Sequence, residues 1–226
     1  MDISCAFATS SDTPAHVQLA ETLGYRRAWL YDSPALYPDV WMILTRCAER
    51  TSRIGLGPGV LVPSLRHPMV NAAAIAELAD QAPGRVAVAI GAGFTGRFTL
   101  GKRPMPWRQV AEYVRCLKAL LAGETAEWDG AKIRMLHLPG YGAKRPVQVP
   151  ILIGADGPKA NPRDEPHVAE LIPFASSTGL TGTAEQVSER VAGLAAVGVT
   201  EVVYQPAGSD IERELHAFAS ATGLAG

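Results

Sequence analysis

The sequence predicts an α/β protein in which helices cover a parallel β-sheet. Three observations predict it: short apolar runs alternate with amphipathic segments of helical period, the apolar runs lack the in-and-out alternation of a half-exposed strand, and glycine or polar residues follow the runs. Six such strands are recognisable. A barrel and an open doubly wound sheet both accommodate them.

Each expected strand is too short and too apolar for a surface helix. The expected strands are Ile3–Ala8, Ala28–Tyr31, Ile54–Val62, Val86–Ile90, Val149–Ile153 and Glu201–Gln205. Another extended stretch, Glu127–Leu136, is centred on Asp129 and Gly130, a favoured two-residue hairpin turn. It is therefore predicted to be a surface hairpin outside the sheet.

Capping residues and apolar side chains three or four positions apart mark the helices. The expected helices are Thr13 to Gly24, Asp39 to Ala48, Pro68 to Ala79, Pro106 to Leu121, Thr183 to Gly198, and a closing helix from Asp210. Thr13 is expected to be an N-cap followed by proline at the first helical position, and Thr183 to Gln186 fits a capping box. The segment from Gly91 to Met105 is predicted to be a loop, and residues 161–182 carry no clear pattern.

Composition limits the kinds of protein that fit. With 226 residues, 47% hydrophobic and 19% charged, the chain can bury one sizeable core, so one domain over residues 1–226 is expected. A net charge of -1 with scattered basic residues leaves no broad surface for nucleic acid or an anionic membrane. No run approaches the ~18 apolar residues of a membrane span, and the start does not resemble a secretion signal, so a cytoplasmic protein is expected.

The three cysteines, Cys5, Cys47 and Cys116, are an odd and widely spaced set. They fit reduced core residues better than disulfides or a zinc site, and no metal site is predicted. A homodimer is the ordinary expectation for a protein of this kind.

Polar and glycine residues follow the predicted strands, and the carboxyl ends of parallel strands meet on one face. Gly91 and Gly93 could approach a phosphate through backbone N–H groups. The turn from Gly154 to Lys159 offers backbone donors and a point charge that suit a phosphodiester. The sequence therefore predicts a ligand site at this face.

Four segments together carry a resemblance to a known family. They are GLGPGVLVPSLRHPMVNAAAIAEL at 55–78, PGRVAVAIGAG at 83–93, VPILIGADGPKA at 149–160 and TGLTGTAEQVSERVAGLAAVGVTEVVYQP at 178–206. They resemble the bacterial-luciferase-like superfamily, and in detail its branch that uses the deazaflavin coenzyme F420, such as methylenetetrahydromethanopterin reductases. The resemblance implies a TIM-type (β/α)8 barrel with the cofactor across the carboxyl ends of the strands.

The resemblance also implies site residues. It implies that the third strand ends in a bulge with a non-proline cis peptide at Gly59-Val60, followed by Leu61, against the back of the deazaflavin ring. Asp32 resembles an acidic cofactor-facing residue of the family, and Ser33 stands where some dehydrogenases of the family have a histidine base. The implied cofactor-binding residues are Gly59, Val60, Leu61, Gly91, Ala92, Gly93, Gly154, Ala155, Gly157 and Lys159.

The chain departs from the family pattern after Ala160, because two βα units of the eight in such a barrel are not recognisable. A contracted barrel, edge pairing across a dimer, and residues 161–182 filling the gap are all open. The resemblance implies an oxidoreductase that transfers a hydride between F420 and an unidentified small-molecule substrate. The alternatives are an FMN-dependent monooxygenase and a catalytically idle flavin- or deazaflavin-binding protein with a shortened barrel.

Overall fold

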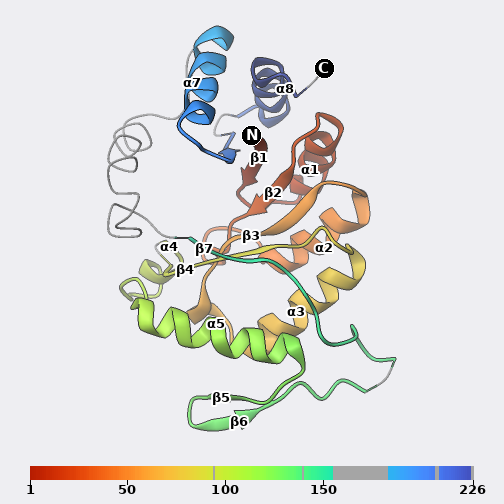
Figure 1. Cartoon of the computed structure of the whole chain (residues 1–226), viewed down its shortest axis with the longest axis vertical. Coiled ribbons are helices and arrows are strands. Elements are labelled where there is room, and N and C mark those ends of the chain that lie inside the picture. Colours follow the sequence, from red (N-terminus) through yellow and green to blue (C-terminus); the bar gives the residue numbers. More distant parts are fainter. Residues whose placement is uncertain (94, 139, 155–182, 207–208, 225–226) are drawn as a thin grey trace.

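One parallel sheet organises the chain in the computed structural model, which describes residues 1–93, 95–138, 140–154, 183–206 and 209–224. Its strands are β1 (Asp2–Phe7), β2 (Arg27–Leu30), β3 (Gly55–Leu61), β4 (Val88–Gly91), β7 (Ile151–Gly154) and β8 (Glu201–Tyr204). The strand order is β7-β4-β3-β2-β1-β8, and every neighbouring pair is parallel (Figure 1).

The strand order identifies the sheet as part of a barrel. The last described strand, β8, pairs with the first, β1, as it would in a closed (β/α)8 barrel. An open doubly wound sheet would carry helices on both faces, whereas here they lie on one (Figure 1). In the described part of the chain the sheet is thus a six-stranded part of a contracted TIM-type barrel. The interruption lies between β7 and β8.

Helices cover one side of this sheet (Figure 1). They are α1 (Thr13–Thr22), α2 (Val40–Arg50), α3 (Pro68–Gln81), α4 (Thr95–Phe98), α5 (Trp107–Ala122), α7 (Ala184–Ala196) and α8 (Ile211–Thr222), with a 3-10 turn η1 (Pro63–Leu65). Consecutive helices α1, α2, α3 and α5 pack on one another, and α8 packs against α7 and α1. None of the described helices has both the length and the hydropathy needed to cross a membrane.

Capping interactions explain most helix ends. Asp39 accepts hydrogen bonds from the backbone N–H groups of Trp41 and Met42 at the start of α2, and Thr183 and Gln186 form the expected capping box of α7. At α1 the expectation was wrong by one residue. The N-cap is Asp12, and Thr13 is the first helical residue. The Thr13 hydroxyl instead accepts a hydrogen bond from the N–H of Ser10 (2.8 Å).

The predicted hairpin is confirmed as an antiparallel pair outside the sheet, β5 (Ala126–Trp128) and β6 (Ala131–Ile133). Asp129 and Gly130 both adopt positive φ angles, 51° and 74°, which a type I′ turn requires. The predicted loop from Gly91 to Met105 was incomplete, because it contains the short helix α4. Four residues carry too little hydrophobic period to reveal such a helix from sequence.

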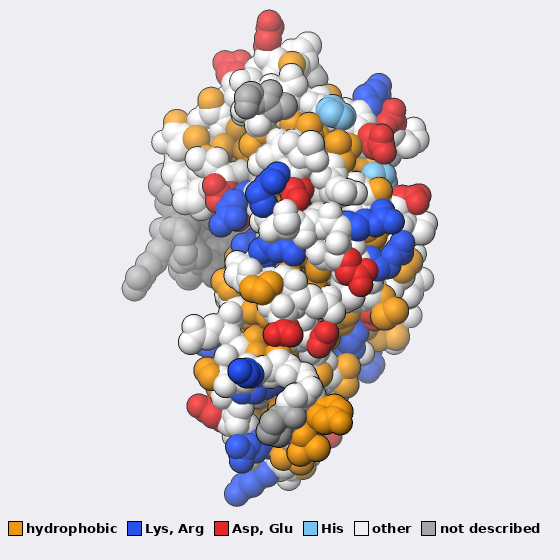
Figure 2. Space-filling view, turned by 90° about the vertical axis from the view of Figure 1, so that its right-hand side faces the viewer, with side chains coloured by type: hydrophobic (Ala, Val, Ile, Leu, Met, Phe, Trp, Pro, Cys, Tyr) orange, Lys and Arg blue, Asp and Glu red, His pale blue; other side chains and the backbone are white. Residues whose placement is uncertain are grey.

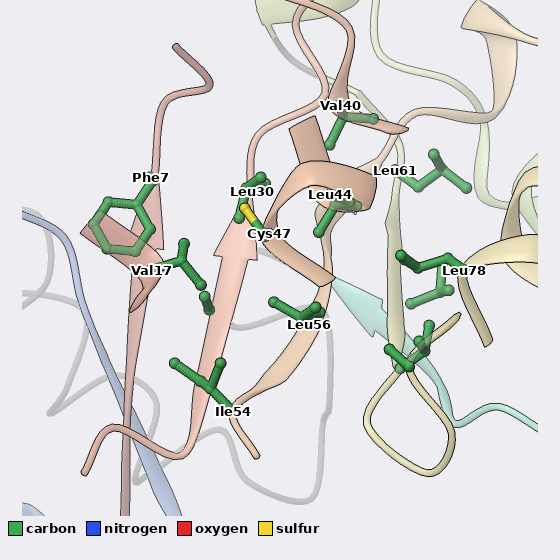
Figure 3. Packing of buried hydrophobic residues seen from close by; sticks show 14 of the residues in the cluster. Phe7, Val17, Leu30, Val40, Leu44, Cys47, Ile54, Leu56, Leu61 and Leu78 are labelled. Carbon is green, nitrogen blue, oxygen red and sulfur yellow. The ribbon is translucent and has the colours of Figure 1, made fainter. Parts of the chain in front are cut away.

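The principal core lies between the sheet and its helices. Figure 3 shows side chains of β1, β2 and β3, such as Phe7, Leu30 and Leu56, packed against Val17 of α1 and Leu44 of α2. All three cysteines are buried free thiols, and burial raises the pKa of Cys47 to about 12. The expected reduced, core-filling role of the cysteines is confirmed.

The inner face of the sheet is packed differently from the core, because large side chains of β2 lie over glycines of β3. Trp29 pairs in register with Gly57, and a Cβ at Gly59 would lie 2.9 Å from the Trp29 Cβ. A Cβ at Gly57 would lie 1.8 Å from the carbonyl oxygen of Ala87, the residue just before β4. The main chain at Ala87 cannot move far enough to make room for a Cβ. Position 57 therefore requires glycine, because the two main chains approach so closely.

We expect Gly57→Ala to destabilise the protein by about 3 kcal/mol or more, since the new methyl group must separate β3 from β4. Gly193→Ala in α7 is the matched control, because a Cβ there meets nothing within 4 Å, and alanine should stabilise the helix by about 0.5–1 kcal/mol. Urea unfolding followed by circular dichroism measures both. Equal stability of Gly57→Ala and the unsubstituted protein would contradict this packing.

Glu21 of α1 anchors the chain just before β3. Its carboxylate accepts hydrogen bonds from the N–H groups of Ser52, Arg53 and Ile54, at 2.7–3.2 Å. Burial acts to raise the pKa of Glu21, but these backbone donors hold it below its ordinary value. The ionised form is therefore favoured in the folded state.

We expect Glu21→Gln to lower the free energy of unfolding by roughly 1 kcal/mol at neutral pH, a modest loss because the group is partly exposed. The folded pKa is below the unfolded one, so this contribution is complete above the unfolded pKa of about 4.3 and is lost as the pH falls through the folded pKa. Urea unfolding across this pH range should show the two proteins converging in acid. The exposed Glu49→Gln on α2 is the control; a difference independent of pH would contradict the assignment.

Candidate functional site

The site begins at the carboxyl end of β3, where the strand bulges. Pairing with β4 shifts register between Gly59 and Leu61, and the Gly59-Val60 peptide bond is cis, as the resemblance implied. A bulge at a strand end redirects the chain and alters where side chains point. Here the bulge residues Gly59 and Val60 line a cavity.

Glycines on two neighbouring strands receive the Val60 side chain. A Cβ on Gly91 at the end of β4 would lie 2.8 Å from a Val60 methyl carbon, and a Cβ on Gly154 at the end of β7 would lie 2.6 Å from the other. Gly93, at a φ of +76°, similarly leaves room for Val62. The structure thus brings together Gly91, Gly93 and Gly154 from the expected site, around the bulge rather than as isolated loops.

The remaining expected cofactor-binding residues separate into two groups. Leu61 is fully buried in the core between sheet and helices, and Ala92 packs against the same core. The Leu61 side chain therefore contributes to packing, and that of Ala92, which is partly buried, does so in part. Ala155, Gly157 and Lys159 lie outside the described residues.

A cavity of about 300 Å³ adjoins the bulge, at the lower end of the range for small-molecule sites. The described residues that line it are Tyr31, Asp32, Ser33, Leu36, Tyr37, Gly59, Val60, Val62, Thr95 and Gly96. They come from the carboxyl ends of β2, β3 and β4 and the segments after them. The expectation that these strand ends converge is confirmed.

Asp32 is the buried charge of this site. Its side chain has no exposed surface, and its two oxygens lie 2.8 and 2.9 Å from one nitrogen of Arg66. One of them also accepts a hydrogen bond from the N–H of Val62 (3.1 Å), just beyond the bulge. Burial raises the pKa of Asp32, while Arg66 and the Val62 N–H act against that rise. These donors suit an ionised carboxylate, so Asp32 holds the bulge as an anion.

Arg66 was missed as a site residue, because sequence reasoning assigned it only to the turn before α3. Its second terminal nitrogen donates to Asp39 at 2.6 Å, so one guanidinium joins two carboxylates. Burial acts to lower the pKa of Arg66, but the two carboxylates raise it above its ordinary value. The signal was available: a carboxylate expected inside the protein needs a partner, and this arginine follows the same bulge.

A chain of hydrogen bonds extends from this ion pair through the helices. The carbonyl oxygen of Arg66 accepts from the Tyr113 hydroxyl (3.3 Å), which accepts from the Asn71 amide (2.6 Å), which in turn accepts from the Trp41 indole N–H (2.9 Å). Trp41 belongs to α2, the helix capped by Asp39. The network therefore closes on itself and ties α2, α3 and α5 to the end of β3.

His67 and Ser33 have simpler surroundings. The Nδ1 atom of His67 accepts from the N–H of Met69 and caps α3, with Pro68 at the first helical position, so His67 has a structural role here. Ser33 lines the cavity, and its carbonyl oxygen accepts hydrogen bonds from the N–H groups of Leu36 and Tyr37. The catalytic roles expected for Asp32 and Ser33 stay predictions.

Comparison with known proteins places these features in a family. The model of the family described as luciferase-like monooxygenase matches residues 8–163. A 5,10-methylenetetrahydromethanopterin reductase of Archaeoglobus fulgidus is 32% identical over 151 residues, which cover 64% of this chain and 43% of the relative. An F420-dependent glucose-6-phosphate dehydrogenase of Microbacterium testaceum is 33% identical over 156 residues, covering 63% of this chain and 46% of the relative. The aligned region thus spans less than half of either relative.

Solved structures support the fold. The F420-dependent tetrahydromethanopterin reductase of Methanopyrus kandleri superposes with a TM-score of 0.72 at 18% identity, covering 98% of each chain. An F420-dependent secondary alcohol dehydrogenase in complex with an F420-acetone adduct gives a TM-score of 0.75 at 15% identity, covering 100% of this chain and 99% of the other. At these identities the similarity establishes the TIM-barrel-like fold.

We expect Arg66→Met to lower the free energy of unfolding by about 3–5 kcal/mol, because it leaves Asp32 buried and unpaired. Asp32→Asn in the same chain should recover part of that loss, since the amide carries no charge. Urea unfolding of the two single variants and the double variant gives their coupling energy. The exposed pair of Arg26 and Asp2 is the control, where Asp2→Asn should cost less than about 1 kcal/mol. Additive effects at Asp32 and Arg66 would contradict the pairing.

Proposed function

Since the chain belongs to the luciferase-like monooxygenase family, we propose that it is an oxidoreductase that transfers a hydride between coenzyme F420 and a small organic substrate. The observation that carries the proposal is the packing of the β3 bulge at the carboxyl ends of β3, β4 and β7. There Gly91 and Gly154 hold Val60 so that the main chain of the bulge borders the cavity. Relatives with F420 in their names, such as the glucose-6-phosphate dehydrogenase of Microbacterium testaceum, support the choice of cofactor.

The described residues fit a flat ring at this position. The bulge presents main chain and one small side chain to the cavity, and the glycine partners leave no Cβ that would displace Val60. Asp32 is already bonded through both oxygens, so it holds the bulge while leaving the cavity without a free anion. Gly59, Val60 and Val62 would hold the ring, and Tyr31, Ser33 and Tyr37 would face it or the substrate.

When bound, the deazaflavin would carry the hydride. The contribution of this chain would be position and exclusion of water. Asp32 would keep the bulge fixed, because it accepts a hydrogen bond from the N–H that follows it and is itself held by Arg66. Thr95 and Gly96 of α4 would border the cavity on another side. A homodimer and a cytoplasmic location stay predictions from the sequence.

We expect the purified protein to bind F420 more tightly than FMN, measured by titration of cofactor fluorescence. Gly91→Ala should weaken F420 binding, because the new methyl group lies where Val60 rests. Gly193→Ala, remote in α7, should leave F420 binding unchanged. Tight binding of FMN alone would overturn the choice of cofactor. Binding of F420 without hydride exchange against any acceptor would favour the idle binding protein.

A further inference from the structure

A second cavity lies where the chain returns from the hairpin of β5 and β6 toward β7 (Figure 1). Its volume is about 450 Å³. It shares Gly140, Gly142 and Lys144 with a neighbouring cavity that also reaches Pro83 and Gly84, in the turn before β4. This second cavity therefore lies toward the amino ends of the strands, and none of its described lining residues belongs to the cavity beside the bulge.

The described residues that line the second cavity carry positive charge and no negative charge. Arg134 and Lys144 are exposed at it, Arg145 is partly buried, and His137 adds an imidazole. The whole stretch 131–148 contains no Asp or Glu. Within the described part of the chain, none of the three cationic side chains forms an ion pair with a carboxylate. Like charges at one cavity repel one another, so they favour a bound anion.

Arg145 is a partly buried cation without a counter-charge. Its Nε and Nη2 atoms are buried and have no hydrogen-bond partner among the described residues, and its Nη1 atom lies 3.4 Å from the carbonyl oxygen of Ala143, a long contact. Burial lowers the pKa of Arg145, whereas the two carboxylates beside Arg66 raise the pKa of that arginine. A buried guanidinium without a partner is costly, so an external anion is the counter-charge that this site lacks.

Close packing holds these side chains near one another. A Cβ at Gly142, whose φ is +98°, would lie 3.0 Å from the Nδ1 atom of His137. A Cβ at Gly123, the residue that ends α5, would lie 3.2 Å from the Cβ of Arg145. The carboxyl end of α5 offers Arg145 only a partial negative charge, about half an elementary charge. The cations are thus gathered by the fold, and the helix end does not balance their charge.

We propose that the second cavity binds a phosphate group, either as inorganic phosphate or as part of a small phosphomonoester. Two guanidinium groups and one ammonium group suit a phosphate dianion, and the planar guanidinium fork matches its oxygen geometry. Because Nε and Nη2 of Arg145 have no bond to lose, this side chain can rotate toward the ligand at little cost. The bound group would join Arg134, which follows β6, to the chain that enters β7, and would stabilise the folded protein.

The test measures phosphate binding by the full chain and does not involve F420. Isothermal titration calorimetry with inorganic phosphate, and separately with glycerol 3-phosphate, at mildly alkaline pH and constant ionic strength should give a dissociation constant of about 1 mM or lower for at least one of them. At ten times that concentration the ligand should raise the Tm by about 3 °C or more. Tighter binding of the ester would identify a phosphorylated small molecule as the ligand, and tighter binding of phosphate would identify the free ion.

Arg145→Met should weaken phosphate binding by about tenfold or more, and without ligand it should be at least as stable as the unsubstituted protein, because a buried unpaired charge is removed. Lys144→Met, at an exposed position, should weaken binding without changing the stability of the ligand-free protein. Arg108→Met is the matched control, because this exposed arginine pairs with Glu112 on α5, and it should bind phosphate normally.

Three results would overturn the proposal. The first is that neither phosphate compound binds to the unsubstituted protein. The second is that Arg145→Met and Lys144→Met bind phosphate as tightly as the unsubstituted protein does. The third is a large loss of stability in ligand-free Arg145→Met, which would show that the guanidinium group is satisfied within the protein.

Discussion

The buried carboxylate of Asp32 imposes the main constraint on this structure. A side chain with no exposed surface cannot keep a negative charge without donors, and the protein supplies them from Arg66 and from the N–H of Val62. The Val62 N–H lies just past the bulge of β3, so satisfying the charge also fixes the main chain that borders the cavity. The same hydrogen bonds thus compensate the charge of Asp32 and fix the geometry of the site.

Arg66 connects the Asp32 site to the surrounding helices. Its guanidinium group also bonds Asp39, the N-cap of α2, and its carbonyl oxygen begins the hydrogen-bond chain through Tyr113 and Asn71 to Trp41. A substitution in any of these helices can therefore affect the site without touching a ligand. Such closed polar networks specify one arrangement, because each member left unpaired is costly in the interior.

Close approach is the second constraint, and it explains the glycines of the inner face. Gly57 is required by the carbonyl of Ala87 and Gly59 by Trp29, while Gly91 and Gly154 make room for Val60. These glycines reduce side-chain packing on the inner face of the sheet, and they make room for a bulge that borders a cavity. The outer face carries the ordinary aliphatic core (Figure 3). Figure 2 shows one face of the molecule, on which Lys and Arg side chains are interspersed with Asp and Glu among hydrophobic ones, in keeping with a net charge of -1.

The sequence by itself determined the six strands, most of the helices, the hairpin at Asp129 and Gly130 and the capping box at Thr183, because periodicity, turn residues and caps are local properties. The convergence of the strand ends followed from the expected parallel sheet, and the resemblance added the bulge at Gly59-Val60. Only the tertiary structure decided that β8 lies beside β1, that Leu61 belongs to the core, and that Arg66 joins Asp32 to Asp39. These depend on contacts between residues far apart in the chain, and no local pattern records which donor will reach a buried charge.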